Sequence, residues 1–228
     1  MTETKIAKET LDYDWTNNNT VHHNYLIKSI SDILKDMNTS DIDLLDVGCG
    51  NGVLTSKISK FFRHATGIDL SESGIEFAQD LENEKLNFEN ISLDEMIERK
   101  KKFKFITSNE VIEHQYMPDD FLNKIHKLLD DEGTLLITTP YNGYIKNLFI
   151  NILGKHDIHY SPLWRHGHIK FFSTKTLKMI MEKCNFSVQK KSFSGRFYPI
   201  SCSMIFFSKK KINYSFFNFF FRKTNNTK

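Results

Sequence analysis

Short apolar runs along this chain alternate with segments whose apolar residues recur at helical spacing. The apolar runs predict strands at residues 42–47, 65–69, 86–89, 103–108 and 134–139. The helical spacing predicts helices at residues 21–37, 53–62, 71–81, 93–99, 118–129 and 174–184. Residues 186–193 and 202–208 alternate between apolar and polar positions, and no helix separates them, so they predict a final antiparallel hairpin.

This order of elements predicts an α/β fold with a Rossmann-like, doubly wound sheet. Strands separated by single helices form right-handed βαβ units, which build a parallel sheet. The hairpin adds an antiparallel pair at one edge, so we expect a mostly parallel sheet of seven strands. The predicted domain covers residues 21–208. A polar segment, residues 1–20, is expected to be flexible, and residues 209–228 form a basic and aromatic tail.

Charge and composition narrow the class of protein. The net charge is only +3 and no long basic stripe is present, so no nucleic-acid partner is expected. The three cysteines lack metal-type spacing, which fits a reducing compartment rather than a disulfide framework. The first residues lack the apolar region of a secretory signal, and no apolar run approaches the roughly 20 residues of a membrane span. We therefore expect a cytoplasmic protein.

A glycine loop follows the first predicted strand. Residues 46–52 read Asp-Val-Gly-Cys-Gly-Asn-Gly, and the second strand ends at Asp69. In open α/β sheets such a loop lies at the carboxyl ends of the strands, where bare backbone and helix N–H groups can approach a cofactor. An acid at the end of the second strand is placed to accept both ribose hydroxyls. Val53 stands where the dinucleotide fingerprint G-x-G-x-x-G has its third glycine, so this is a different motif.

The pattern D-x-G-x-G-x-G resembles that of class I S-adenosylmethionine-dependent methyltransferases, from about residue 21 to residue 208. The resemblance implies S-adenosylmethionine as cofactor, with Asp46 orienting the loop and the methionine amino group and Asp69 holding the ribose. Asn109 matches the position beside the methionine moiety, and Asp94 lies in the loop that often contacts adenine. The expected cofactor-binding residues are Asp46, Gly48, Cys49, Gly50, Asn51, Gly52, Asp69, Leu70, Asp94 and Asn109.

A second motif follows the fourth predicted strand, where residues 110–114 read E-V-I-E-H. On a helix, Glu110, Glu113 and His114 would share one face. Together with residues 138–141, TTPY, the motif resembles the ubiquinone-biosynthesis O-methyltransferases. That resemblance implies methyl transfer to a small-molecule hydroxyl, such as that of a catechol-type quinone precursor. A phenol is mostly protonated at neutral pH, so a base or a metal would assist.

Glu110, Glu113 and His114 are therefore the candidate catalytic residues. They are also the candidate ligands of a divalent cation, Mg²⁺, Mn²⁺ or Zn²⁺, because carboxylates and imidazole suit these ions. The alternative interpretation needs no metal, since acids at a helix N-terminus are stabilising through the helix dipole.

Residues 141–170 break the strand–helix rhythm and are rich in aromatic residues and histidines. They lie between the fifth strand and the next helix, so we expect a substrate lid over the acceptor site. Tyr141, His166 and His168 are its candidate substrate-binding residues. The alternative is a packed surface loop whose aromatic residues belong to the core.

The tail combines lysines at 209–211 with a phenylalanine-rich run at 216–221. Basic residues beside clustered phenylalanines suit peripheral contact with the inner, anionic face of a membrane. Docking of these phenylalanines on the domain or on a second subunit is an equal alternative. The sequence predicts no particular oligomeric state.

Specific residues argue for or against other functions. Amino-methylating nucleic-acid enzymes need Pro-Pro-aromatic after the fourth strand, where this chain has Ser108-Asn109-Glu110, and no proline precedes a cysteine as cytosine-C5 methylation requires. Methylation of another small metabolite, such as a sugar, amine or carboxylic acid, stays an alternative. The intact glycine loop and Asp69 argue against a non-catalytic cofactor-binding protein.

Overall fold

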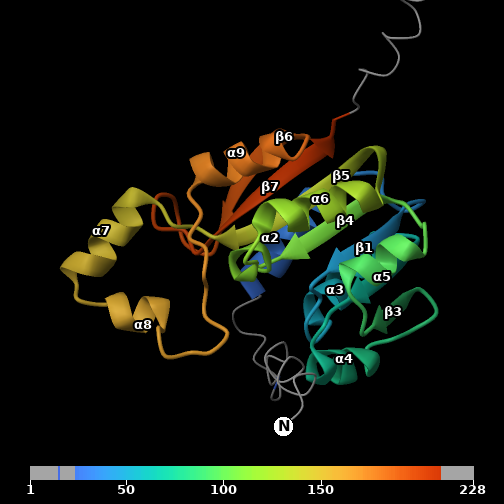
Figure 1. The fold of residues 1–228 in the computed structure, drawn as a ribbon, viewed down its shortest axis with the longest axis horizontal. Coiled ribbons are helices and arrows are strands. Elements are labelled where there is room, and N and C mark those ends of the chain that lie inside the picture. The colour runs from blue at the N-terminus through green and yellow to red at the C-terminus, as the bar shows by residue number, and fades with distance from the viewer. Residues whose placement is uncertain (1–14, 16–23, 212–228) are drawn as a thin grey trace, which may run out of the picture.

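A seven-stranded sheet runs through the part of the chain that the computed structural model describes, Trp15 and residues 24–211 (Figure 1). Its strands are β1 (Asp43–Val47), β2 (His64–Ile68), β3 (Leu86–Glu89), β4 (Phe103–Asn109), β5 (Leu129–Pro140), β6 (Phe186–Ser194) and β7 (Ser203–Lys210). The order is β3-β2-β1-β4-β5-β7-β6. Only β7 pairs antiparallel, with both β5 and β6, and the other pairs are parallel. The predicted doubly wound sheet with an antiparallel edge hairpin is confirmed.

Helices cover both faces of this sheet. The α-helices are α2 (Asn24–Lys35), α3 (Val53–Ser59), α4 (Glu72–Gln79), α5 (Leu93–Glu98), α6 (Pro118–Leu128), α7 (Tyr144–Ile152), α8 (His156–Tyr160) and α9 (Thr174–Lys183). Helices α2, α3 and α4 pack into one apolar core, and α5, α6 and α9 pack into another. Adjacent residues Leu44 and Leu45 of β1 belong to different cores, so the strand is buried on both faces. Burial on both faces explains why the parallel strands read as nearly continuous apolar runs.

Local sequence sets where several helices begin. The Ser71 side chain accepts a hydrogen bond from the Gly74 N–H at the start of α4, as an N-cap serine does. Ser92 and Glu95 form a capping box at the start of α5. Pro118 is the first residue of α6, where its missing N–H costs nothing.

The strand order reverses between β1 and β4. The chain leaves β1 toward β2 and β3 on one side, and continues through β4 and β5 on the other. Ligands of open α/β sheets bind at the carboxyl ends of the strands beside such a reversal. The glycine loop after β1, Asp69 after β2 and the segment after β4 therefore meet at one edge of the sheet.

Two parts of the fold differ from the prediction. Strand β5 starts at Leu129, directly after α6, rather than at residue 134, and its register against β4 shifts between Phe103 and Phe105. Strand β7 continues to Lys210, two residues past the predicted end of the domain.

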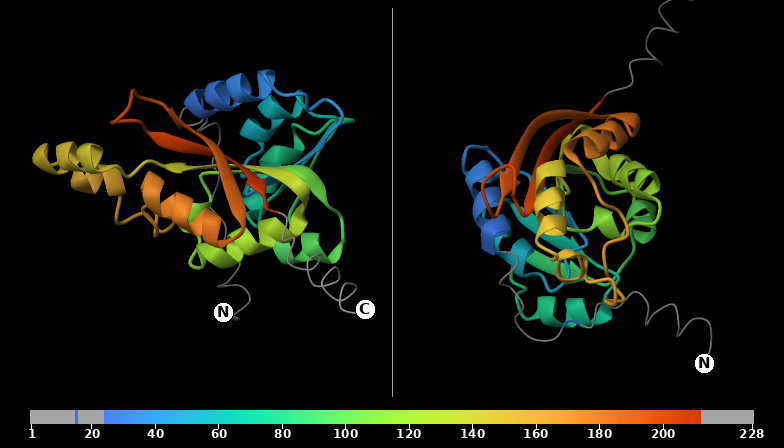
Figure 2. Two further views of the ribbon diagram at one scale, coloured as in Figure 1. Left: turned by 90° about the horizontal axis from the view of Figure 1, so that it is seen from above. Right: turned by 90° about the vertical axis from the view of Figure 1, so that its left-hand side faces the viewer.

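Residues 144–160 form the helices α7 and α8, which project from the body beyond the end of the sheet (Figure 2). Ile145, Leu148, Phe149 and Ile152 of α7 recur at i, i+3, i+4 and i+7, the spacing of one helix face. The helical period was therefore present in the sequence, and the expectation of a lid or surface loop missed it.

Within the described residues, no helix combines the length and apolarity needed to cross a membrane. The phenylalanine-rich run at 216–221 lies outside the described residues, as do residues 1–20 apart from Trp15. Their predicted roles stay predictions.

Candidate active site

A cavity of about 2070 Å³ extends from the glycine loop to α7 and α8. Nine of the ten predicted cofactor-binding residues line it, and Gly52 is the exception. Glu110, His114, His166 and His168 line it too, whereas Glu113 and Tyr141 are not among its lining residues. The cavity thus joins the predicted cofactor and acceptor residues in one space.

The glycine loop has a backbone that only glycine adopts easily. Gly48, Gly50 and Gly52 all have positive φ angles, of 75°, 53° and 73°. A Cβ added to Gly48 would lie 2.4 Å from a methyl carbon of Val111, and one added to Gly52 would lie 2.7 Å from the ring of Phe88. All three glycines therefore leave room for a neighbouring side chain, which is Trp15 at Gly50, and Gly48 and Gly50 also line the cavity.

Asp46 places a buried carboxylate under this loop. Its Oδ2 accepts a hydrogen bond from the Thr55 hydroxyl at 2.5 Å, and the Asn109 Nδ2 lies 3.5 Å from its Oδ1. Burial raises the pKa of Asp46 to about 7. A positively charged ligand group would favour the ionised carboxylate. The buried Oδ1 of Asn109 has no hydrogen-bond partner among the described residues, so it can accept from a ligand N–H.

Asp69 holds the loop with the same carboxylate that is expected to bind the ribose. Its Oδ2 accepts the Gly50 N–H and its Oδ1 accepts the Ser71 N–H, both at 2.8 Å. Asp69 also lines the cavity, as expected of the residue that the resemblance assigns to the ribose.

Trp15 is a site residue that the sequence analysis missed. It lines the cavity, its backbone N–H donates to the Ser73 hydroxyl at 3.1 Å, and its ring packs on Gly50 and Gly74. An isolated tryptophan in a polar segment was the available signal, because so large an apolar side chain rarely stays in water.

Comparison with known proteins agrees with this geometry. Residues 21–191 match the model of the methyltransferase domain family. The chain belongs to this methyltransferase family. A ubiquinone biosynthesis O-methyltransferase of Pelagibacter ubique is 32% identical over 168 residues, covering 72% of this chain and 70% of the relative. One of Rickettsia bellii is 26% identical over 174 residues, covering 75% and 71%.

This chain shares its fold with methyltransferases of known structure. The magnesium protoporphyrin IX methyltransferase of Synechocystis, solved with bound S-adenosylhomocysteine, matches with a TM-score of 0.65. The match covers 92% of this chain and 95% of that one, at 16% identity. Together with the glycine loop and Asp69, the family makes S-adenosylmethionine the cofactor.

The motif at residues 110–114 does not form the helix that was considered in the sequence analysis. Glu110 has a positive φ of 55°, and only residues 112–114 form a short 3-10 turn, η2 (Ile112–His114). The Glu110 carboxylate accepts hydrogen bonds from the Thr138 hydroxyl at 2.8 Å and the Ser203 hydroxyl at 3.2 Å. The interpretation of Glu110 as one face of a helix with Glu113 and His114 is therefore wrong.

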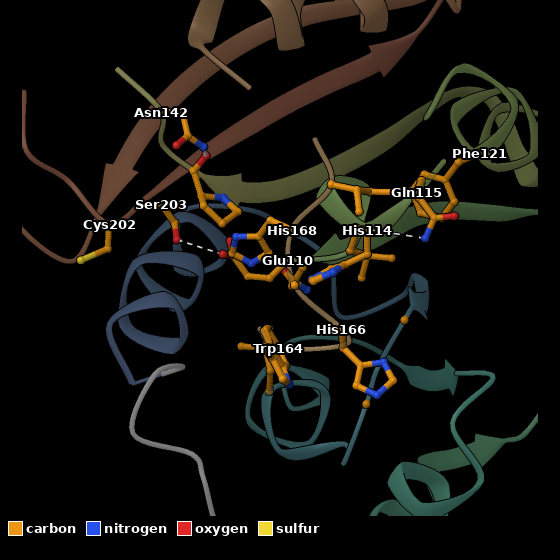
Figure 3. Close-up of a pocket in the computed structure, with 18 of the residues that line it drawn as sticks. Glu110, His114, Gln115, Phe121, Asn142, Trp164, His166, His168, Cys202 and Ser203 are labelled. Atoms are coloured by element: carbon orange, nitrogen blue, oxygen red, sulfur yellow. Dashed lines mark hydrogen bonds between the residues drawn. The ribbon is translucent and has the colours of Figure 1, made fainter. Parts of the chain in front are cut away.

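The structure instead gathers Glu113 and His114 with His168. Figure 3 shows the side chains of His114 and His168 in the pocket. One ligand atom from each of the three residues lies within 4.8 Å of the others, and the two imidazole rings are 4.9 Å apart. Oε1 of Glu113 is buried without a hydrogen-bond partner among the described residues. A carboxylate and two imidazoles that converge on one point fit a divalent cation, with His168 in the place expected for Glu110.

Burial also sets the protonation of this cluster. It lowers the pKa of His114 to about 4, and the neighbouring His168 acts in the same direction. It raises the pKa of Glu113, and the charge of Glu110 adds to this. His114 is therefore neutral at pH 7 and can accept a proton or bind a metal.

The lid segment contacts the cluster through residues 164–170, its return segment, which follows the helices α7 and α8. The Glu113 carbonyl accepts the N–H groups of Ile169 and Lys170 at 3.0 and 2.9 Å. The Trp164 ring lies 6.4 Å from that of His114 and 6.2 Å from that of His166. These contacts place residues 164–170 over the acceptor half of the cavity.

Tyr141 lies apart from this group. It is buried, and its ring packs 5.1 Å from Phe193 of β6. Its side chain thus supports the end of β5, and it stays only a prediction as a substrate-binding residue.

Proposed function

We propose that this methyltransferase transfers the methyl group to a hydroxyl of a small aromatic molecule, a catechol-type quinone precursor. The cluster of Glu113, His114 and His168 carries the proposal, because it lies in the same cavity as the cofactor residues. The relatives named as ubiquinone biosynthesis O-methyltransferases support the same chemistry.

S-adenosylmethionine supplies a methyl carbon activated by its sulfonium, so the chain must align the acceptor and help remove its proton. Neutral His114 can accept the proton of a phenol directly. Alternatively, Glu113, His114 and His168 hold a divalent cation that stabilises the phenolate, with the donor set favouring Mn²⁺ or Zn²⁺ over Mg²⁺.

The test is methyl transfer to a panel of catechols, prenylated catechols, sugars and amines, with and without EDTA. We expect turnover of the catechols. Loss of that turnover in EDTA and its return with a divalent cation would assign the cluster to metal binding, while insensitivity would assign His114 as base. Turnover confined to sugars or amines would refute the proposal.

A further inference from the structure

The charged residues that line the cavity differ between its two ends. At the cofactor end its lining carries the carboxylates of Asp46, Asp69 and Asp94. At the other end the lining comes from α7, α8, residues 161–169 and the loop between β6 and β7. These segments carry four basic side chains, and the carboxylate that lines the cavity near one of them, Lys146, is that of Glu110. The four are Lys146, Lys155, Arg165 and Arg196.

None of these four side chains forms an ion pair with another residue in the described ranges, although surface pairs occur elsewhere on the domain. Their lining neighbours include Phe149, Ile150 and Tyr160, which are apolar or aromatic. Lys155, Arg165 and Arg196 are exposed, so water screens their charges, whereas the ammonium of the buried Lys146 is less screened than in bulk water.

Lys146 is the buried member of this group. It projects from α7, the helix at the left of Figure 1, and is buried with only 9% of its surface exposed. Its Nζ donates to the carbonyls of Tyr141 and Cys202 at 2.9 and 3.4 Å. An ammonium has three N–H donors, so one is left for the cavity that Lys146 lines.

One other cationic group, Arg196, acts on Lys146. Both Lys146 and Arg196 act on His159 of α8. The carboxylate that acts on Lys146 is that of Glu110, whose two oxygens already accept hydrogen bonds from Thr138 and Ser203. Glu110 therefore offsets this positive charge only in part.

We propose that Lys146 and Arg196 form a subsite for an anionic group, a carboxylate or a phosphate, on the methyl acceptor. The subsite rests on the proposed function and adds to it, because a neutral catechol would leave these charges unused. It makes the acceptor an aromatic acid whose ring lies between the Glu113–His114–His168 cluster and the apolar wall of α7.

The test compares acceptors that differ only in charge. Calorimetric titration of the full chain, saturated with S-adenosylhomocysteine, would use protocatechuate, the neutral protocatechuyl alcohol and the phosphate ester of that alcohol. A hydrogen bond to a charged group predicts that at least one anion binds about tenfold tighter than the alcohol. Which anion binds tighter identifies the group.

Two variants locate the effect. Lys146→Met and Arg196→Gln should each reduce the anion-to-alcohol affinity ratio several-fold, and the exposed Arg196 keeps the test valid if the buried Lys146 variant does not fold. Lys175→Met on α9 removes the same charge outside the cavity lining and should keep the ratio.

Equal affinities for the three compounds, or a ratio unchanged in both variants, would overturn the subsite. Because this readout is binding, it is separate from the proposed function. Absence of methyl transfer to every catechol would refute that function while leaving the affinity ratio to decide the subsite.

Discussion

Replacing Gly48 by alanine would place a methyl group in a space that Val111 already fills. The added Cβ would lie 2.4 and 3.1 Å from the two methyl carbons of Val111, far inside van der Waals contact. Gly48 also has a φ of 75°, which strains any residue with a Cβ. The substitution therefore combines two separate costs, one steric and one conformational.

The two costs can be given magnitudes. Left-handed backbone costs a non-glycine residue about 1–2 kcal/mol. Overpacking of a filled site adds about 1–3 kcal/mol. We expect Gly48→Ala to lower the free energy of unfolding by about 2–5 kcal/mol. Cofactor affinity should fall with it, because Gly48 lines the cavity.

Urea unfolding measures the loss, and the chain offers a matched control. Gly154 has a φ of 63° but no atom within 4 Å of an added Cβ. Gly154→Ala should therefore cost only the conformational part, about 1–2 kcal/mol. Val111→Ala removes the clashing methyl carbons. In that background, the loss of unfolding free energy caused by Gly48→Ala should fall to the same value.

Equal losses for Gly48→Ala and Gly154→Ala would refute the steric part of this reasoning. So would a Gly48→Ala loss that does not change when Val111 is shortened. Either result would mean that the loop moves to accommodate the methyl group.

Three further predictions concern the site. Cofactor affinity should rise about tenfold from pH 6 to pH 8, because a cation requires the ionised Asp46 carboxylate, whose pKa is about 7. Calorimetry should show this slope and its loss in Asp46→Asn, and an equal slope in both proteins would contradict it. His114→Gln should lower kcat for a catechol about 10²–10⁴-fold if the imidazole removes the proton. The exposed control His64→Gln should not, and unchanged turnover by the His114 variant would exclude that role. Cofactor titration should change the tryptophan fluorescence of Trp164→Phe but not of Trp15→Phe, since Trp15 packs on the glycine loop. A signal that survives without Trp15 would place the cofactor elsewhere.

The order of elements and the cofactor end of the site were predictable from the sequence. Both depend on residues close together in the chain, such as the glycines at 48, 50 and 52, whose backbone conformation is a local property. Strand periodicity then places Asp46 and Asp69 at the carboxyl ends of neighbouring parallel strands.

The acceptor end was not predictable in the same way. Glu113 and His114 meet His168 because the return segment of the lid hydrogen-bonds to the Glu113 carbonyl, a contact between residues more than fifty positions apart. Glu110 does not belong to this cluster, because its positive φ turns the chain out of β4 before the 3-10 turn begins.

Local sequence thus determined the strands, the helix starts and the loop that receives the methyl donor, since backbone preference and burial pattern act within a few residues. Tertiary structure alone decided that Trp15 covers Gly50, that His168 joins His114, and that Lys146 is buried at the far end of the cavity. Those placements follow from how distant segments pack against one another. They are also what determines which molecule can accept the methyl group.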